Sequence, residues 1–598
     1  MLFVMLNSFQ HLIFKTRFRN KFGMTQIVIM KFVIDYIKKN KLLLFIVLPA
    51  FFLYMLVIFP SGTFFCFKDA CGINFWGVQG HDAIWHLAIA NVSFQKFPFI
   101  APTFAGENLY GYNYLLDFFI FLLSKIGIPA IFSYFKLFPV VWFILFTGLL
   151  IIFARKIKDS KLFIFLFLLL SYFAGSFSFI LTWIHDKTIN GSSTLLPQPI
   201  MHMMSNLPYA FSLLPFLTIL ILMKEKNLRL KNVLIMGLCI FLIMGLKFYG
   251  GVISIFLIFT YLFLTIPFKN IKKLIKYSVI ICLFIFSSIL LFYDPMRSFK
   301  SGAVFGWAPF ALVHTITEEP NQFYLRDLTD ARYYILAQGR IGPRFIWIEF
   351  INLTLFLIFY LGTRILAFFY LGFLFLQRKM EKFDLTIILT ILFSIFLTVT
   401  LVQKAEWWNT IQFFFYAIFL LTIHLARLVH DLIKSNKPVL IGLTALLLLL
   451  SVPTSLDLIR LFAVTPGATY LPVDEIKALN FLKQQPGGIV LSPLYDKKWK
   501  NYNKPNLLFA YEDTAYVTAF SGKQSYLVNI LQLRLTGVLY QKRLARLEKK
   551  DCSILDEIDY VYEIRKLLDE EKIMVKCRPK NSKKIFENKS VNIYSITK

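Results

Sequence analysis

The sequence contains a series of long apolar runs, and this feature limits the fold more than any other. An α-helix needs about 20 mostly apolar residues to cross the hydrocarbon core of a bilayer. Because lipid offers no hydrogen bonds to the backbone, such runs cross as helices. We therefore expect an α-helical polytopic membrane protein, which the 57% hydrophobic and 16% charged composition also indicates. The twelve runs cover residues 42–60, 113–127, 131–153, 162–184, 207–223, 232–247, 250–267, 277–293, 346–376, 385–402, 413–428 and 439–455.

Charged residues between the runs predict the orientation of the chain. There are 64 Lys and Arg against 34 Asp and Glu, a net charge of +30. Most basic residues lie in short clusters in alternate connectors, which marks those connectors as cytoplasmic. Because the charge is dispersed in this way, we expect no nucleic-acid partner. About 11–13 transmembrane helices are expected, and we favour eleven. Either the run 113–127, which contains Asp117, only dips into the membrane, or the run 346–376 is two short helices and the charge rule fails locally.

Three regions follow from this pattern. Residues 1–41 form a basic cytoplasmic segment, in which Met24 and Met30 are alternative starts. Residues 42–465 form the transmembrane domain, with the loops 61–112 and 294–345 on the extracytoplasmic side. Residues 466–598 alternate helix-like and strand-like stretches, which predicts an extracytoplasmic α/β domain.

The six cysteines divide into three pairs. Cys66 and Cys71 lie in the first loop, Cys552 and Cys577 in the tail, and the other two inside apolar runs. Both polar pairs are compatible with disulfides if those regions face an oxidising compartment. Their spacing does not suggest a zinc site.

The stretch from Gly80 to Asn113 is the longest polar-rich interruption in the first half of the chain. Its segment WHLAIA predicts a helix, on which Asp82 and His86, four residues apart, project from one face. Such a carboxylate is suited to act as a general base, or to bind a divalent cation, for a substrate presented from the bilayer. The alternative is an exposed helix residue or an N-cap.

The same region resembles the N-terminal part of GT-C fold membrane glycosyltransferases. The residues that carry the resemblance are GHDAIWHLAIA followed by PFIAPTFAGENLYGYNYLLDFFIFLLSKIGIP, and bacterial members of the dolichyl-phosphate-mannose-protein mannosyltransferase and aminoarabinose transferase type are the most similar. Beyond about residue 200 only the layout is similar. The resemblance implies that Asp82 is the catalytic base or is linked to a metal. Many members have two neighbouring acids where this chain has His81 and Asp82, which leaves the metal role open.

A polyprenyl-phosphate-linked sugar donor, which the resemblance implies, requires positive charge for the departing phosphate. Candidates are Arg332, Arg340 and Arg344, which precede a span in the outer loop, and Lys247, which interrupts the run 232–267. Anchoring to anionic lipids is the alternative for the arginines. Glu406, between two spans, is a candidate for contact with an acceptor sugar.

Second acids for a metal site are Glu107 and Asp186, either of which would join Asp82 around Mg²⁺ or Mn²⁺. A divalent cation is the cofactor that the resemblance allows, and none is certain. His81 and His86 complete the candidate site, as substrate-binding and catalytic residues respectively.

These observations favour a glycosyltransferase of the bacterial cell envelope, multi-pass in the cytoplasmic (inner) membrane. It would move a sugar from the lipid-linked donor to a glycan, lipid or protein acceptor on the outer face. The alternatives are a lipid-linked saccharide transporter or flippase, and a non-catalytic envelope-assembly protein. Transport predicts ionisable groups at mid-depth in broken helices, whereas transfer predicts them in outer loops, where this sequence has most of its candidates.

Overall fold

The computed structural model describes residues 41–196, 198–225, 227–294, 305–320, 322–403, 406–463, 467–500, 505–577 and 579–597. The predicted cytoplasmic segment lies outside these residues except for Lys41, and the predicted boundary at residue 465 also lies outside them. By its internal contacts the chain divides after Ala50, so the first unit contributes only the beginning of helix α3 (Lys41–Ile58) to the described part. The second unit, 51–598, contains everything else described below.

The described residues contain eight helical segments that are long and apolar enough to cross a membrane, and two bent pairs bring the number to ten. With the shorter apolar helix α13 they match the eleven predicted crossings, while α5 is too short to cross. The chain is thus a polytopic membrane protein. The spans are α3, α6–η3–α7 (Ala130–Ile157), α8 (Lys161–Phe173) with α9 (Ser178–Asp186), α11 (Pro199–Ser205) with α12 (Leu207–Met223), α13 (Leu230–Leu246), α14 (Phe248–Thr265), η4–α15 (Phe268–Phe292), α19–η5–α20 (Pro343–Leu376), α21 (Lys382–Thr400), η6–α22 (Trp407–Lys434) and α23–α24 (Pro438–Ala463), with α5 at Leu115–Lys125.

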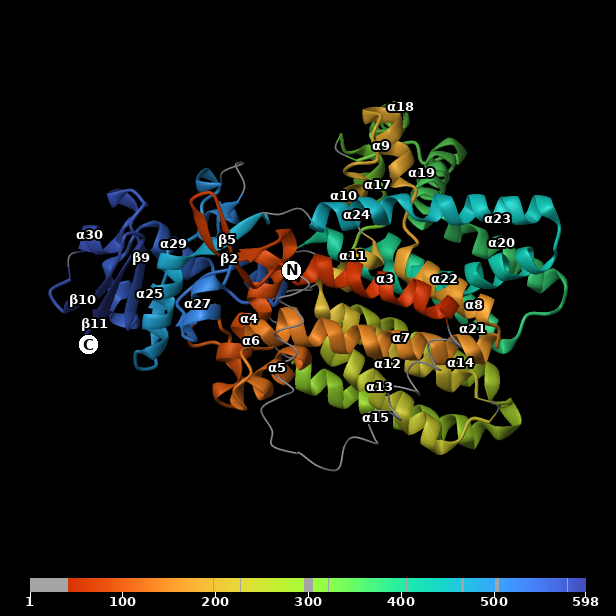
Figure 1. The fold of residues 1–598 in the computed structure, drawn as a ribbon, viewed down its shortest axis with the longest axis horizontal. Helices are drawn as coiled ribbons and strands as arrows, with labels where there is room; N and C mark the ends of the chain where they lie inside the picture. Colours follow the sequence, from red (N-terminus) through yellow and green to blue (C-terminus); the bar gives the residue numbers. More distant parts are fainter. Residues whose placement is uncertain are drawn as a thin grey trace. The chain divides into compact units, whose positions relative to one another are not determined.

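Close packing of α13 depends on small residues. It lies between α12 and α15, and Figure 1 shows the three helices side by side. A Cβ atom added at Gly237 would lie 2.3 Å from Cδ2 of Phe284, and one at Gly245 would lie 2.5 Å from Cζ of Phe292. Without a hydrophobic driving force between helices in lipid, such close approach is what holds them together.

A buried arginine joins two interrupted spans and the continuous helix α22. The 3₁₀ segment η5 (Gly362–Ile365) carries Arg364, which is 3% exposed. Its NH1 donates to the carbonyl of Gly175 at 3.0 Å, its NH2 donates to that of Ala174, and its Nε donates to Thr422 Oγ1 at 2.9 Å. These carbonyls follow the end of α8, where the helix leaves acceptors unpaired. The guanidinium therefore satisfies backbone that lipid would leave without a partner.

The tail forms the predicted α/β domain around a five-stranded sheet in the order β10-β11-β9-β6-β8. Strand β6 is parallel to its neighbours β9 and β8, of which β8 is an edge strand, and β10 and β11 extend the sheet beyond β9 as an antiparallel hairpin. Helix α25 (Val473–Gln484) packs on β10 and β11, and these blue elements are grouped in Figure 1. The strands are β6 (Ile489–Leu491), β8 (Gln524–Ser525), β9 (Tyr560–Ile564), β10 (Ser582–Glu587) and β11 (Val591–Ile596).

A second sheet connects the first outer loop to the tail. The hairpin β1 (Thr63–Phe67) and β2 (Ala70–Phe75) continues into β5 (Thr469–Pro472) and β7 (Asn506–Leu507). Because β2 is hydrogen-bonded to β5, both must lie on the same side of the membrane, which requires an even number of crossings between them.

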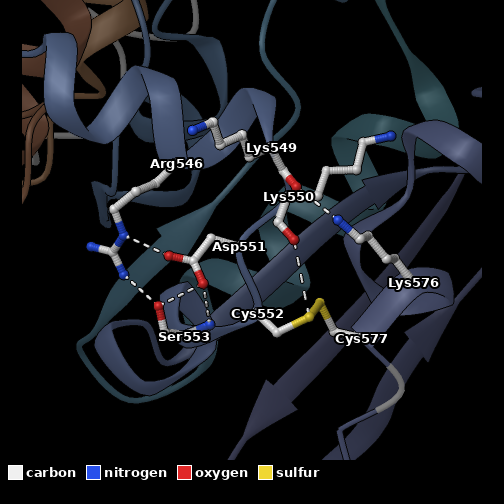
Figure 2. Close-up of a disulfide and its surroundings, with 8 residues drawn as sticks. All are labelled: Arg546, Lys549, Lys550, Asp551, Cys552, Ser553, Lys576 and Cys577. Carbon is white, nitrogen blue, oxygen red and sulfur yellow. Dashed lines mark hydrogen bonds and ion pairs between the residues drawn. A yellow bond between two sulfur atoms is a disulfide. The ribbon is translucent and has the colours of Figure 1, made fainter.

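Two disulfides link segments of the hairpin and of the tail. Cys66–Cys71 closes the β1–β2 hairpin, and Cys552–Cys577 links η8 (Cys552–Glu557) to α30 (Ile573–Cys577). Figure 2 shows the second of them beside Asp551, whose carboxylate accepts from Arg546 Nε and from Ser553. The two remaining cysteines are unpaired and lie on α13 and α15.

The tail also fixes the helix that carries the candidate site. The stretch TAFSGKQSYL spans α27 (Tyr516–Ser521) and β8, and α27 packs on α4 (Asp82–Val92). Asn91 Nδ2 donates to the carbonyl of Ala519 at 2.7 Å, and Gln524 Nε2 donates to that of Ala101 at 2.7 Å. Lys523 donates to two carbonyls just after α25. This lysine therefore has a structural role, in agreement with the absence of a nucleotide-binding spacing.

Candidate active site

Helix α4 begins at Asp82 and is buried along nearly its whole length, as the WHLAIA segment predicts. Asp82 lies in its first turn, where a carboxylate is favoured by the helix dipole. The preceding 3₁₀ turn η1 (Gly77–Gly80) is held by Gln79, whose Nε2 donates to the carbonyl of Met204 at 3.1 Å. The start of α4 is thereby fixed against the α11 region.

Asp82 opens into a cavity of about 660 Å³. This transfer cavity, as we call it, lies between the start of α4, the α13–α14 junction, the β3–β4 pair (Phe305–Trp307 and Leu401–Gln403), η6 and helix α28 (Ile530–Leu535) of the tail. It brings together five residues that the sequence singles out from distant parts of the chain. They are His81, Asp82, His86, Lys247 and Glu406.

The Asp82 carboxylate is partly accessible and pairs with the neighbouring histidine. His81 Nδ1 lies 3.0 Å from its Oδ1, and the Asp82 side chain is 33% exposed. Burial alone would raise its pKa, but the hydrogen bond from His81, the charge of that histidine and the nearby Lys247 hold the pKa of Asp82 below its usual value. An accessible carboxylate of this kind can accept a proton from a substrate hydroxyl.

His86 is held by an acid from a different helix. Its Nδ1 lies 2.9 and 3.0 Å from the two carboxylate oxygens of Asp117 on α5, and its ring stacks on Tyr134. Both members of the pair are almost completely buried. A carboxylate at Nδ1 fixes the ring orientation and the tautomer, so Nε2 is the nitrogen left for the cavity side.

Lys247 lies between α13 and α14, where the backbone leaves the helical conformation. Asn113 supports this turn, because its Nδ2 donates to the carbonyl of Leu246 at 2.8 Å. The 17 residues of α13 rise about 25 Å, so Lys247 lies close to one boundary of a hydrocarbon core about 30 Å thick. The predicted interruption of the run 232–267 is therefore a turn near the membrane boundary and not a break at mid-depth.

The rest of the lining is rich in amides and aromatic rings. Tyr249 OH donates to Gln403 Oε1 at 2.8 Å, and Gln412 Nε2 donates to Asn409 Oδ1 at 3.2 Å. Such groups form hydrogen bonds with hydroxyls and pack against apolar ring faces. The amides are Asn113, Asn206, Gln403, Asn409, Gln412 and Gln532, and the aromatic residues are Tyr112, Phe248, Tyr249, Tyr293 and Phe305.

The structure does not bring the predicted arginines to this cavity. Arg332 on α18 (Arg326–Ala337) is engaged with two carboxylates, at 2.8 Å from Glu349 and 3.0 Å from Glu318. Arg340 and Arg344 are exposed. None of the three is among the described lining residues, because α17 (Ala311–Glu318), α18 and α19 (Pro343–Leu361) form a separate cluster whose acids bind Arg332.

The predicted metal site has no obvious set of ligands in the described part of the chain. Asp186 is exposed at the end of α9, and neither it nor Glu107 lines the cavity with Asp82. Among the described residues, no three or more His, Cys, Asp and Glu side chains are grouped to hold a metal ion. The described residues therefore do not fit a divalent cation.

Several lining residues were not found by sequence reasoning. Glu512, Leu531, Gln532 and Thr536 come from the tail, more than 400 residues after Asp82. These tail residues lie beside Asp82 because α27 packs on α4, and no local sequence pattern reveals this packing. Asp117 was noted only as an interruption of an apolar run, although a buried acid beside a candidate histidine is a functional signal.

Comparison with known proteins gives similarity at the level of solved structures alone. No family model matches the chain, and no curated protein matches it by sequence. The oligosaccharyltransferase of Archaeoglobus fulgidus, in its apo form, aligns over 87% of this chain and 69% of its own with 12% identity and a TM-score of 0.46. The same enzyme in complex with an inhibitory peptide and a dolichol-phosphate aligns over 88% and 70% with 11% identity and a TM-score of 0.47. A third structure of it, with Zn and sulfate, gives 11% identity and a TM-score of 0.46 over 87% and 68%. Similarity at this level does not determine an activity, so the functional inference depends on the cavity.

Proposed function

We propose that the protein is a membrane glycosyltransferase that moves a sugar from a polyprenyl-phosphate donor to an acceptor hydroxyl. The observation that supports this most is the shared cavity of Asp82 and Lys247 at a membrane boundary. It combines an ionised carboxylate, a buried cation and a lining of amides and aromatic rings. This transfer has three requirements: a base for the acceptor hydroxyl, a positive charge that stabilises the departing phosphate, and groups that bind the sugar hydroxyls.

In the proposed step the acceptor oxygen attacks the anomeric carbon of the donor sugar. Asp82 accepts the proton of that hydroxyl, the bond between the anomeric carbon and the phosphate oxygen breaks, and the lipid phosphate leaves with both electrons of that bond. Lys247 interacts with the departing phosphate, whose negative charge grows during the step. His86, oriented by Asp117, donates or accepts one hydrogen bond that holds the substrate in line.

The position of the cavity supports transfer on the extracytoplasmic face of the cytoplasmic membrane. The β1–β2 hairpin and the tail, which flank the cavity, each contain a disulfide. Disulfides persist in oxidising compartments and are rare in the cytosol. The basic connectors between the spans predict cytoplasmic loops at the other ends of these helices. A glycan, lipid or protein of the cell envelope is the proposed acceptor.

The test uses the full chain in proteoliposomes with a panel of radiolabelled polyprenyl-phosphate sugars and a detergent extract of envelope acceptors. We expect transfer of label by the wild type, and a loss of at least tenfold in donor affinity for Lys247→Met. Lys269→Met, at an exposed position in the η4 turn, is the matched control and should behave as the wild type. Label that crosses the bilayer without being transferred would identify a transporter instead.

A further inference from the structure

A second cavity lies in the tail, at the carboxyl end of its parallel strands. It has a volume of about 700 Å³ and is lined by the segment 491–499 after β6, by residues of β9 and by residues of α28. In the strand order β9-β6-β8 the chain passes from β6 to β8 on one side and returns to β9 on the other. Ligands bind in parallel α/β sheets where the connections diverge in this way. Its size also falls within the range of about 300–1,000 Å³ typical of ligand pockets.

Helix α28 forms the wall between this tail cavity and the transfer cavity. Leu531 lines both cavities, Gln532 and Leu535 line only the transfer cavity, and Arg534 lines only the tail cavity. The start of the helix is fixed by Asp513, whose carboxylate accepts the backbone N–H groups of Asn529 at 2.9 Å and Ile530 at 2.6 Å. A chain-like molecule that ends in the transfer cavity would therefore reach the tail cavity by crossing one short helix.

The lining of the tail cavity combines ring faces with an unsatisfied acceptor. Tyr495 and Trp499 are half-buried in it. Glu563 on β9 is 4% exposed, and its Oε1 has no hydrogen-bond partner although it is buried. A buried polar atom without a partner is costly unless a ligand or water supplies the donor.

The charges of the tail cavity are largely balanced. Lys498 lies 3.4 Å from Asp496 and is also paired with Glu571. The described lining contains five acidic and five basic side chains. Because these charges balance, the cavity has no net preference for a charged ligand. The acidic residues are Asp496, Asp513, Glu548, Glu563 and Glu571, and the basic residues are Lys497, Lys498, Arg534, Lys550 and Lys572.

We propose that the tail cavity binds neutral sugar units of the acceptor, so that the acceptor is a glycan chain whose end lies in the transfer cavity. Aromatic rings pack on the apolar faces of sugar rings, and the Glu563 carboxyl accepts a hydrogen bond from a sugar hydroxyl. This inference rests on the proposed function and names its acceptor class. A protein or lipid acceptor would make no use of the tail cavity.

The test measures binding and not transfer. Full-length Asp82→Asn protein in nanodiscs is titrated by calorimetry with neutral glucose or N-acetylglucosamine oligomers of increasing length, with uronic-acid oligomers and with unglycosylated peptides. We expect a neutral series whose affinity rises with chain length, and a loss of at least tenfold for Trp499→Ala and for Glu563→Met, which keeps the side-chain length and removes the acceptor oxygens. Trp347→Ala, at an exposed position on α19, is the control and should bind normally.

Each outcome separates the inference from the proposed function. If no neutral oligomer binds, if only peptides bind, or if Glu563→Met and Trp499→Ala bind as the wild type, the glycan site is overturned, whatever Asp82→Asn does to transfer. If length-dependent binding is lost in these variants while Asp82→Asn still transfers label at the wild-type rate, the glycan site stands and the proposed base does not.

Discussion

His86 and Asp117, 31 residues apart in sequence, form a buried pair in which Nδ1 lies 2.9 Å from one carboxylate oxygen and 3.0 Å from the other. The pair joins the helix that carries Asp82 to the short helix α5. Because Asp117 has no exposed surface, its contribution to the site acts through the histidine. Substitutions of Asp117 and of His86 should therefore have similar effects on the reaction rate.

We expect Asp117→Asn to lower kcat by about 10-fold or more, with little change in the donor KM, because the imidazole loses its fixed tautomer. His86→Gln should have a similar effect, and the double variant should be no worse than the more damaging single variant, since both changes remove one unit. Steady-state kinetics of the three variants test this. Additive losses would show that the two residues act independently.

The buried acid Glu475 predicts a pH-dependent stability of the tail. It accepts hydrogen bonds from Tyr516 OH at 2.9 Å and Tyr562 OH at 3.0 Å, and burial raises the pKa of Glu475 to about 7 from 4.5. The folded state therefore holds the proton more tightly than the unfolded state between these values. The free energy of unfolding should fall by ~3 kcal/mol as the pH rises from about 4.5 to about 7.

Thermal unfolding of the wild type and Glu475→Gln at pH 5 and pH 8 measures this contribution. Other groups titrate in both proteins, so the difference between them isolates Glu475. We expect the wild type to lose more stability than Glu475→Gln between the two pH values. Equal losses would mean that the carboxyl is not protonated in the folded state at pH 5.

The disulfide Cys552–Cys577 predicts a redox-dependent stability. Its loop is longer than that of Cys66–Cys71, with sequence separations of 25 and 5. In the chain-entropy description its removal costs about 3.5 kcal/mol, against about 2 kcal/mol for the shorter loop. Thermal unfolding of Cys552→Ser and Cys66→Ser should show the larger loss for Cys552→Ser. Free thiols at all four positions in protein isolated from membranes would contradict an oxidising location.

Arg364 is predicted to stabilise the membrane domain without acting in catalysis. Arg364→Met leaves the carbonyls of Ala174 and Gly175 without this donor, which costs about 1–3 kcal/mol for each unsatisfied group. We expect a lower unfolding temperature in detergent and an unchanged donor KM. The exposed Arg344 gives the control variant Arg344→Met, which should unfold like the wild type. A changed KM in Arg364→Met would indicate coupling to the cavity.

The sequence was sufficient for the features that depend on local pattern. Apolar run length predicted most of the spans, and the charge pattern favoured a segment 113–127 that only dips into the membrane, in agreement with the short helix α5. The segment WHLAIA predicted the helix, and the four-residue spacing predicted that Asp82 and His86 share one of its faces. The sequence did not reveal which side chains from distant parts of the chain contact one another. Arg332 is paired with Glu318 and Glu349 on neighbouring helices. From the charge pattern alone, this residue was a candidate for binding the donor phosphate.

The tail shows the same limit more clearly. Its alternating pattern predicted an α/β domain, but its contribution to the transfer cavity depends on contacts such as Asn91 with Ala519, which lie 428 residues apart. Neither residue has a distinctive local signal. The residues that line the cavity could therefore be identified only from the three-dimensional structure.

The most direct test of the central claim is the rate of sugar transfer by Asp82→Asn in proteoliposomes, with Asp186→Asn as the matched control. Asparagine keeps the size of the side chain and cannot accept the proton, so we predict a fall of at least 10²-fold in kcat with donor binding retained, and wild-type kinetics for Asp186→Asn. Transfer by Asp82→Asn at the wild-type rate would contradict the assignment of this carboxylate as the base.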